Sequence, residues 1–531
     1  MQGAKRYHIK VIYCLFFMSG ISGLIFETVW LRMLSRTLGN TVWATAVVLA
    51  AFMAGLALGS LILGRYGDRL INGMKLYALL ELLIGISALC LTLALNELTP
   101  LYQLIHALTG GERFWLAVFQ SLLMFFLLVI PTSLMGGTLP ILIAYARLHD
   151  TKFICGAGYL YGLNTLGALL GVVGSGIFTI GFFGEKMTLL MGVLLNLIVC
   201  LAASSLSRVP LSSPPSEEMP NIAVRPLVIQ QPVLEYSDAI RKLALIAYFF
   251  NGFVAMSYEI IWMRIFQIEV GTSVYAFSTM LAFFLLGIGT GSIVVGTLGI
   301  KVRNTLRLFG ALQIFIALYS LIGLYLFTLF SPFESKMLIN LNNMLVMPLL
   351  VVFPITFVFG MLFPLVAQSF VGSEDQTGRD TGFLYFMNTL GCIAGSISCG
   401  FFLIDYFGTR GTMLFLAGVN FLIGIAVYYS TSKASVRTHA TILAVMVLLL
   451  TVGYYSPDPF LYAAKEIISR VYKQRSGEVG IFYHKEASAA TTTAFGIRKE
   501  GRSRSLLVNG IGMTSLAVEA KLMSHIPILA V

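Results

Sequence analysis

Charged residues are scarce in this chain. Asp, Glu, Lys and Arg make up 11% of its 531 residues, whereas a soluble domain carries about 25%. Hydrophobic residues reach 57%, and the mean hydropathy is +0.87. These values exclude an ordinary soluble domain and predict an integral membrane protein, whose main partner is the lipid bilayer. The net charge of +11 does not indicate a nucleic-acid partner, because much of it lies in short loops between apolar segments.

Patterns that bind metals or cofactors are also missing. The six cysteines include no CxxC pair and no His/Cys cluster, so neither a disulfide framework nor a metal site is predicted. No glycine-rich phosphate-binding loop occurs, and no Ser/His/Asp or Cys/His set can be assembled. The sequence therefore predicts no cofactor within these 531 residues. His484 and His525 stand alone, which favours a structural role for both.

Long apolar segments fill most of the chain. A helix needs about 20 apolar residues to cross a bilayer. Pro131 and Pro140 lie within one long segment, which predicts a broken or kinked helix there. The predicted spans are 11–34, 41–64, 75–96, 113–146, 157–181, 186–206, 243–266, 274–297, 307–330, 344–370, 381–404 and 411–430, followed by a thirteenth apolar run at 439–454.

The chain contains an internal repeat. Residues 26–32 recur 232 positions later as residues 258–264, and Glu, Trp and Arg keep their places. Residues 164–167, Asn-Thr-Leu-Gly, recur 224 positions later as residues 388–391. Each copy holds six predicted spans, an even number, so both copies have the same orientation. Parallel repeats of this kind build the two halves of the major facilitator fold.

The predicted fold is therefore an all-α polytopic membrane protein with two parallel six-helix repeats of the major facilitator type. An extra hydrophobic segment and a short β-rich C-terminal tail follow, with strands expected at 478–484, 489–498 and 505–508, a turn at 499–502 and a helix start at 518–524. Because the sequence stops within an apolar run at 526–531, we expect it to continue in a longer protein. The predicted units are 1–206, 207–240 (a linker), 241–432, 433–455 and 456–531.

Lysine and arginine predict the orientation. They cluster before the first span and in alternate loops, whereas the other loops hold mostly single basic residues. This pattern places the N-terminus in the cytoplasm and the protein in the inner (cytoplasmic) membrane. Thirteen spans would then put the tail outside, although basic residues at 465–475 favour the inside. Either the run at 439–454 does not cross, or the tail is external.

Two carboxylates at equivalent repeat positions lie within apolar spans. Glu27 and Glu259 are each followed five residues later by an arginine, Arg32 and Arg264. A five-residue step turns roughly 140° around a helix, so the two groups do not form the usual i,i+4 pair. One interpretation is a cation or proton site where the repeats meet. The alternative is an interhelical ion pair that locks each half, with the arginine reaching the membrane interface.

Further polar residues recur between the copies. Glu81 corresponds to Gln313, and Asn164 corresponds to Asn388. Such residues form hydrogen bonds between helices or line a cavity, and the sequence leaves both interpretations open. The small-residue spacing that permits close helix contact also occurs in both copies, at Gly167 and Gly171 and at Gly391 and Gly395.

The repeated Gly20…Glu27-x-x-Trp30-x-Arg32 block and the Asn-Thr-Leu-Gly helices resemble the bacterial family of fused major facilitator/spermidine synthase-like proteins, over essentially the whole chain. The tail segments 506–510 and 521–527 are similar to the start of a spermidine synthase domain. The resemblance implies a link to polyamine metabolism. It also implies a downstream Rossmann-like domain that binds decarboxylated S-adenosylmethionine or a related adenosine compound.

The tail departs from that family. Soluble aminopropyltransferases have Asp-Gly-x-x-Gln where this chain has Asn509 and Gly510 followed by Ile-Gly-Met. Glu519 is the acid that this segment supplies, and His525 lies in the second matching motif. Whether the protein is an enzyme is therefore left open. The alternatives are a secondary transporter of a small cationic or amphipathic metabolite, with Glu27, Glu259 and Glu81 as coupling carboxylates, and a non-catalytic membrane scaffold whose tail binds a partner chain.

Overall fold

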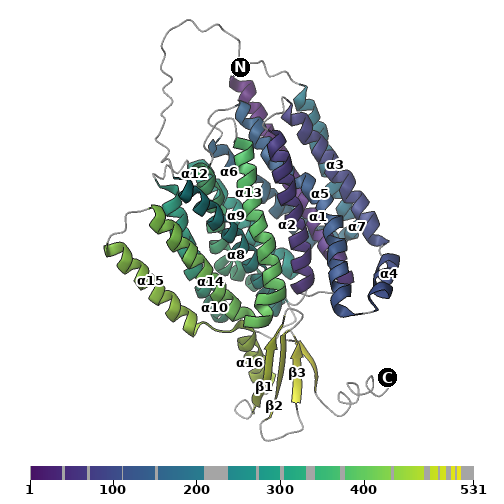
Figure 1. Cartoon of the computed structure of the whole chain (residues 1–531). Coiled ribbons are helices and arrows are strands. Elements are labelled where there is room, and N and C mark those ends of the chain that lie inside the picture. Colours follow the sequence, from purple (N-terminus) through teal and green to yellow (C-terminus); the bar gives the residue numbers. More distant parts are fainter. Residues whose placement is uncertain are drawn as a thin grey trace.

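A computed structural model gives the fold of most of the chain (Figure 1). It describes residues 2–38, 42–67, 72–97, 99–110, 112–149, 154–208, 237–270, 274–298, 304–330, 341–370, 377–431, 436–471, 479–487, 491–497, 504–508 and 511–515.

Within these ranges, eleven helical segments are long and apolar enough to cross a membrane. Two of them, 158–207 and 379–430, contain 50 and 52 residues, which is about 75 Å of helix against a hydrocarbon core of about 30 Å. Each contains a glycine with left-handed backbone, Gly184 (φ 76°) and Gly408 (φ 66°), where the chain folds back and crosses again. The all-α polytopic prediction is therefore confirmed.

The two repeats form two helical halves. In the first half the elements are α1 (Gln2–Leu38), α2 (Val42–Gly67), α3 (Gly73–Asn96), α4 (Thr99–Thr109), α5 (Arg113–His149), α6 (Ile154–Val173), the π-helix η1 (Gly174–Thr179) and α7 (Ile180–Ser207). In the second they are α8 (Asp238–Val270), α9 (Val274–Leu298), α10 (Thr305–Phe330), α11 (Leu341–Val351), α12 (Phe353–Phe370), α13 (Thr377–Ser398), the π-helix η3 (Cys399–Leu403) and α14 (Ile404–Thr431).

The helix interruption lies in the other repeat. The segment 113–146 was expected to be broken or kinked at its prolines; α5 is not broken and continues through Pro131 and Pro140. The interruption occurs instead between α11 and α12, at Val352. A membrane helix tolerates an internal proline where neighbouring helices and nearby hydroxyls satisfy the freed backbone groups. α5 packs along α2 and α3, which supplies such support.

The halves meet along two equivalent pairs of helices. α6 packs on α9, and α13 packs on α2. In each pair a serine hydroxyl donates a hydrogen bond to a carbonyl of the other half, Ser292 to Gly158 over 2.9 Å and Ser396 to Ala46 over 2.8 Å. α1 packs on α6, and α8 packs on α13. The first helix of each half therefore lies beside the interface.

Glycines on α6 and α13 allow the backbones of α1 and α8 to pack closely against them. A Cβ atom added at Gly167 would lie 2.0 Å from a backbone carbonyl oxygen of α1, and one at Gly391 would lie 1.8 Å from the carbonyl oxygen of Phe249 in α8. Any larger side chain would separate the backbones. The recurrent small-residue spacing is thus a packing feature that places α1 and α8.

The tail contains a helix, α16 (Pro459–Val471), and a four-stranded antiparallel sheet in the order β1-β2-β3-β4. β1 (Val479–Glu486), β2 (Thr491–Ile497) and β3 (Arg504–Val508) match the three predicted strands closely, whereas β4 (Ile511–Ser515) and α16 were not predicted. α16 covers the sheet through Ala464 and Ile468, which pack with Phe495 and Leu507. The helix expected at 518–524 lies outside the described residues.

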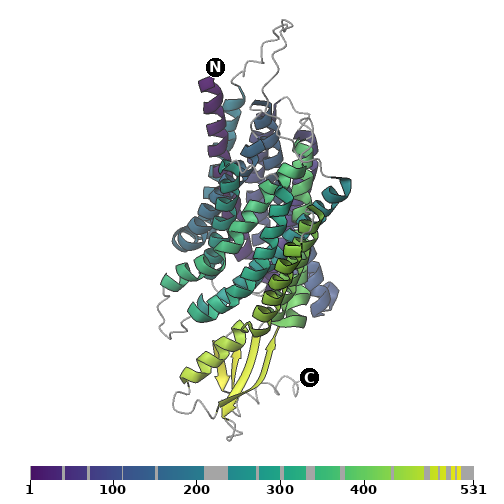
Figure 2. The same ribbon diagram turned by 90° about the vertical axis from the view of Figure 1, so that its left-hand side faces the viewer.

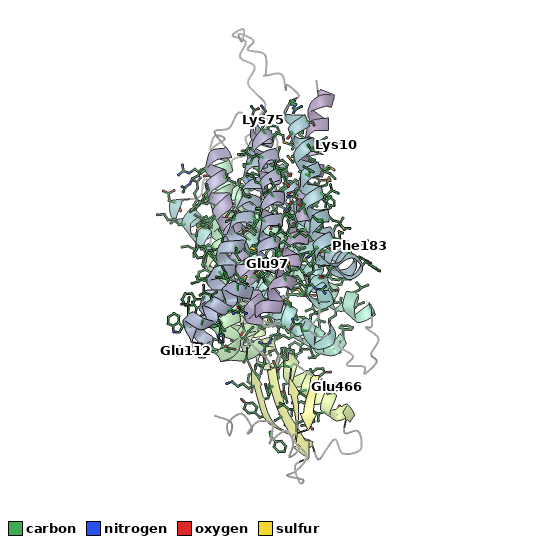
Figure 3. The ribbon with its side chains drawn as sticks, turned by 90° about the vertical axis from the view of Figure 1, so that its right-hand side faces the viewer. Lys10, Lys75, Glu97, Glu112, Phe183 and Glu466 are labelled. Atoms are coloured by element: carbon green, nitrogen blue, oxygen red, sulfur yellow. The ribbon has the colours of Figure 1, made fainter. Side chains whose placement is uncertain are left out.

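The sheet and the N-terminus lie at opposite ends of the bundle (Figures 1 and 2). α15 (Val436–Tyr455) runs along the outside of the second half and leads to the sheet. It packs on α10, where the Tyr325 hydroxyl donates to the carbonyl of Val452 over 2.9 Å. The run at 439–454 lies within a helical segment, 438–469, that is long and apolar enough to cross a membrane. Figure 3 shows Lys10 and Lys75 at the N-terminal end, and Glu112 and Glu466 toward the sheet.

Candidate functional site

The two repeated carboxylates are buried and interact electrostatically with each other. Glu27 lies on α1 and Glu259 on α8, and their side chains are close enough to interact electrostatically. Both residues are buried, with 5% and 6% exposure. Neither carboxylate has a hydrogen bond or an ion pair with any residue that the structure describes. The repeat has thus placed two buried acids at one point of its pseudo-symmetric interface.

The charge of this pair has a direct consequence. Moving an ionised carboxylate out of water costs several kcal/mol, on the order of 5 or more, unless an opposite charge or hydrogen bonds compensate. Two neighbouring ionised carboxylates would add mutual repulsion to that cost. The pair therefore favours occupancy by a positive charge, either a proton on one carboxyl group or a cation held between both.

A thiol and three phenol side chains belong to the same group of electrostatically interacting residues as the two acids. Cys392 on α13 interacts electrostatically with Glu259. Beyond it lie three tyrosines that also interact with one another or with Cys392: Tyr248 on α8, Tyr161 on α6 and Tyr385 on α13. Phenol rings and hydroxyls can contact a cation through the ring face or the oxygen. The sequence analysis did not assign these tyrosines, although Tyr161 recurs as Tyr385 with the same offset as the asparagines.

The two arginines pair elsewhere. The Arg32 Nε atom lies 3.0 Å from Oε1 of Glu185, at the start of the second crossing in α7. The Arg264 Nη2 atom lies 3.7 Å from Oε2 of Glu486 in β1. The interhelical ion pair considered for Glu27 and Glu259 is therefore not formed, and both acids remain available at the interface.

Gln313 and Asn388 belong to a hydrogen-bonded network in the second half. Nε2 of Gln313 donates to Oδ1 of Asn251 over 2.8 Å, and Nδ2 of Asn251 donates to Oδ1 of Asn388 over 3.4 Å. Asn388 lies on α13 and Asn251 on α8, so the network ties α8 to α10 and α13. These amides join helices within one half and are not part of the carboxylate pair.

The first half has an acid at the corresponding place. Glu81 on α3 is fully buried, and both of its carboxylate oxygens lack a hydrogen-bond partner among the described residues. It faces Tyr77 and Ser19, and Ser19 precedes Glu27 by eight residues, which is about 12 Å along α1. The carbonyl of Glu81 accepts a hydrogen bond from Asn196 over 3.3 Å. Asn164 packs its backbone against Gly20. Glu81 is thus separate from the pair.

A second polar cluster lies where the tail meets the bundle. Asp458, His484 and Glu486 each place a ligand-type atom within 4.8 Å of the others, a set that could hold a metal ion. Nδ1 of His484 lies 2.8 Å from Oγ1 of Thr493, and the backbone N–H of Thr409 donates to Glu486 over 3.0 Å. Burial raises the pKa of Glu486 and lowers the pKa of His484. Local Cys/His spacing does not reveal this set, because Asp458 is distant in sequence from the other two residues.

The tail motif residues Asn509, Gly510, Glu519 and His525 lie outside the described residues, so the structure places none of them.

Comparison with known proteins identifies the architecture. No protein-family model and no curated protein sequence matches the chain. Among solved structures, a mutant of the nucleoside transporter NupG matches with a TM-score of 0.50 and 15% identity, over 79% of this chain and 99% of that one. The chain has the major facilitator fold. Human organic anion transporter MFSD10 (TM-score 0.49, 14% identity, 80% and 99% covered) and the E. coli fucose:proton symporter FucP (0.46, 11%, 80% and 98%) also match.

The predicted resemblance to fused major facilitator/spermidine synthase-like proteins is wrong. The solved structure that matches with a TM-score of 0.50 is a nucleoside transporter, and no family model, of a synthase or of any other protein, matches the chain. The resemblance in the tail depended on short strings of small and apolar residues, which antiparallel strands of many folds share. The link to polyamine metabolism has no support in these comparisons, and the adenosine compound expected for a downstream domain stays a prediction.

Proposed function

We propose that this protein is a secondary transporter that exchanges a small cation for protons across the inner membrane, with its N-terminus in the cytoplasm. The observation that carries the proposal is the buried pair of Glu27 and Glu259 at the interface of the halves. Parallel repeats of this fold bind their substrates between the halves and expose the site to each side in turn.

The carboxylate pair supplies the coupling. When the halves rock, the pair must cross a low-dielectric region, where uncompensated negative charge is costly. A bound cation or a bound proton removes that charge, so the site crosses when it is occupied by either one. Movement of the cation in one direction is then linked to movement of protons in the other. Tyr161, Tyr248 and Tyr385 offer rings that favour an organic cation over a small hydrated metal ion.

The proposed orientation agrees with the charges at the two ends. Basic residues such as Lys10 and Lys75 lie at the N-terminal end of the bundle (Figure 3). At the other end, exposed aromatic side chains project at the return turns and at the end of α15: Phe182, Phe183, Tyr406, Phe407, Tyr454 and Tyr455. A basic cytoplasmic end and an aromatic band at the interface are typical of a multi-pass membrane protein.

The test measures transport by the purified protein in proteoliposomes. A proton gradient is imposed, and its dissipation is recorded with a pH-sensitive dye inside the vesicles after addition of sodium, choline or tetraethylammonium, because exchange of one monovalent cation for one proton carries no net current. We expect an organic cation to dissipate the gradient in the wild type but not in Glu27→Gln or Glu259→Gln. Glu81→Gln is the matched control, because it removes a buried acid outside the pair and should keep this exchange.

Two results would contradict the proposal. One is the absence of any cation-dependent proton movement in the wild-type protein. The other is proton movement in Glu27→Gln and Glu259→Gln that equals the wild-type rate per inserted molecule, which would make the two acids structural.

A further inference from the structure

The return turns of the two repeats differ at one position that matters. In the first half Gly184 is followed by Glu185, whose carboxylate pairs with Arg32 of α1. The equivalent of Glu185, 224 residues later, is Thr409, although the glycine before it and the arginine of the first helix are both kept as Gly408 and Arg264. The second repeat has therefore kept the arginine and lost its acid.

The tail brings a carboxylate to that place. Oε2 of Glu486 accepts hydrogen bonds from the backbone N–H of Thr409, over 3.0 Å, and from the Thr409 hydroxyl. The same oxygen lies 3.7 Å from Nη2 of Arg264, which also donates to Oγ1 of Thr491 in β2 over 2.8 Å. Glu486 thus reaches the arginine of the second half from the end of a β-strand.

The tail also covers the rest of this turn. Arg410 donates from Nη2 to the carbonyl of Tyr454 over 2.7 Å and from Nε to the hydroxyl of Ser456 over 3.1 Å. The Arg264 guanidinium lies over the ring of Phe460, 5.0 Å from its centroid. In the first half, no described residue of the tail covers the corresponding turn, and an open cavity of about 410 Å³ is lined by Arg32, Ile180, Phe183, Gly184, Glu185 and Lys186.

We propose that the end of the second half is a carboxylate-binding surface whose partner is the tail of the same chain. In the first half, Glu185 on the last helix pairs with Arg32 on the first helix. In the second half, Glu486 connects the corresponding helices by contacting both Arg264 on α8 and Thr409 on α14. The tail is then a working part of the second half and moves with it when the halves rock. Its helix and sheet contact α8, α10 and α14, which all belong to the second half.

Burial explains why the second half requires this contact. The side chain of Arg32 is 40% exposed, so water can solvate it without Glu185. The side chain of Arg264 is only 4% exposed. Asp405 and Asp458 also interact electrostatically with Arg264, but Glu486 has the largest effect among these acids. A buried guanidinium that loses this acid is destabilised, and Thr409 supplies no charge in its place. Loss of the tail contact should therefore weaken the helix bundle itself.

The experiment compares full-length variants in detergent micelles. Two quantities are measured: hydrogen exchange of the sheet amides, which reports docking of the tail, and thermal unfolding of the bundle. Glu486→Gln should increase exchange of the sheet about tenfold or more and lower the unfolding temperature of the bundle. Lys485→Gln, the exposed neighbour in β1, is the matched control and should change neither quantity.

A second variant separates the two effects. Adding Thr409→Glu to Glu486→Gln restores within the bundle the acid that the first repeat has at this place. We expect the unfolding temperature to recover while the sheet still exchanges rapidly. If Glu486→Gln leaves both quantities unchanged, the tail is only an appended domain. If Thr409→Glu fails to restore the bundle, Glu486 does not replace the lost acid, and the proposal is wrong.

Discussion

Gly391 offers a steric test of how α8 is placed. Alanine at this position would put a methyl carbon 1.8 Å from the carbonyl oxygen of Phe249, whereas real Cβ atoms essentially never come within 3.0 Å of another atom. α8 must then move away from α13 by about 1.2 Å, the difference between these distances. Alanine gains up to about 1 kcal/mol in helix propensity, but overpacking of this kind costs about 3 kcal/mol. We expect a net loss of about 2 kcal/mol.

Unfolding in mixed detergent micelles measures this loss. Gly418→Ala on α14 is the matched control, because a Cβ atom there would have no atom within 4 Å. That variant should be as stable as the wild type or up to about 1 kcal/mol more stable. The two substitutions thus differ in sign. A Gly391→Ala protein with wild-type stability, or a Gly418→Ala protein that loses as much, would refute the close packing of α8 on α13.

Two further predictions concern the tail end of the bundle. Arg264→Ala should cost about 3–5 kcal/mol in the same unfolding assay, because it leaves Glu486 buried without its ion-pair partner. Arg32→Ala, at a side chain that is 40% exposed, should cost about 1 kcal/mol or less, and equal losses would contradict this difference. Because burial lowers the pKa of His484 from its ordinary value of 6.5, the docked sheet should lose stability as pH falls through that value. Hydrogen exchange of the sheet should show this loss in the wild type, and a loss that persists in His484→Gln would refute it.

Much of the candidate site could be predicted from the sequence because the repeat marks it. A carboxylate within one apolar span is ambiguous, but its recurrence as Glu259, with the same tryptophan and arginine after it, assigns both acids to equivalent helices. Parallel repeats related by an axis along the membrane normal place both acids at equivalent positions, and because binding sites of such proteins lie where the repeats meet, a site at that interface was expected. The sequence could not show that the two side chains would be buried and interact electrostatically with each other.

The contacts of the tail were not predictable from local patterns. Glu486 and Arg264 are 222 residues apart in the sequence, and no periodicity connects a strand end to a helix end. α16 had a readable signal, since Phe460, Ala463, Ala464 and Ile468 are spaced for one buried helix face. The prediction missed it because no element was assigned between the apolar run at 439–454 and the first predicted strand at 478–484.

The position of the helix break shows a different limit. Prolines mark both α5 and its repeat partner, but only the second copy is interrupted. A proline removes one backbone hydrogen bond and introduces a steric clash, and the response depends on the neighbouring helices. Those neighbours come from other parts of the chain, so the local sequence does not determine which copy breaks.

The most direct test of the central claim measures proton release on cation binding. Purified protein in weakly buffered detergent solution is mixed with choline or tetraethylammonium while pH and bound cation are recorded. If Glu27 and Glu259 hold either a proton or a cation, the wild type should release about one proton per bound cation, and the Glu27→Gln, Glu259→Gln double variant should bind none and release none. Cation binding without proton release, or the same release by the double variant, would contradict the exchange mechanism.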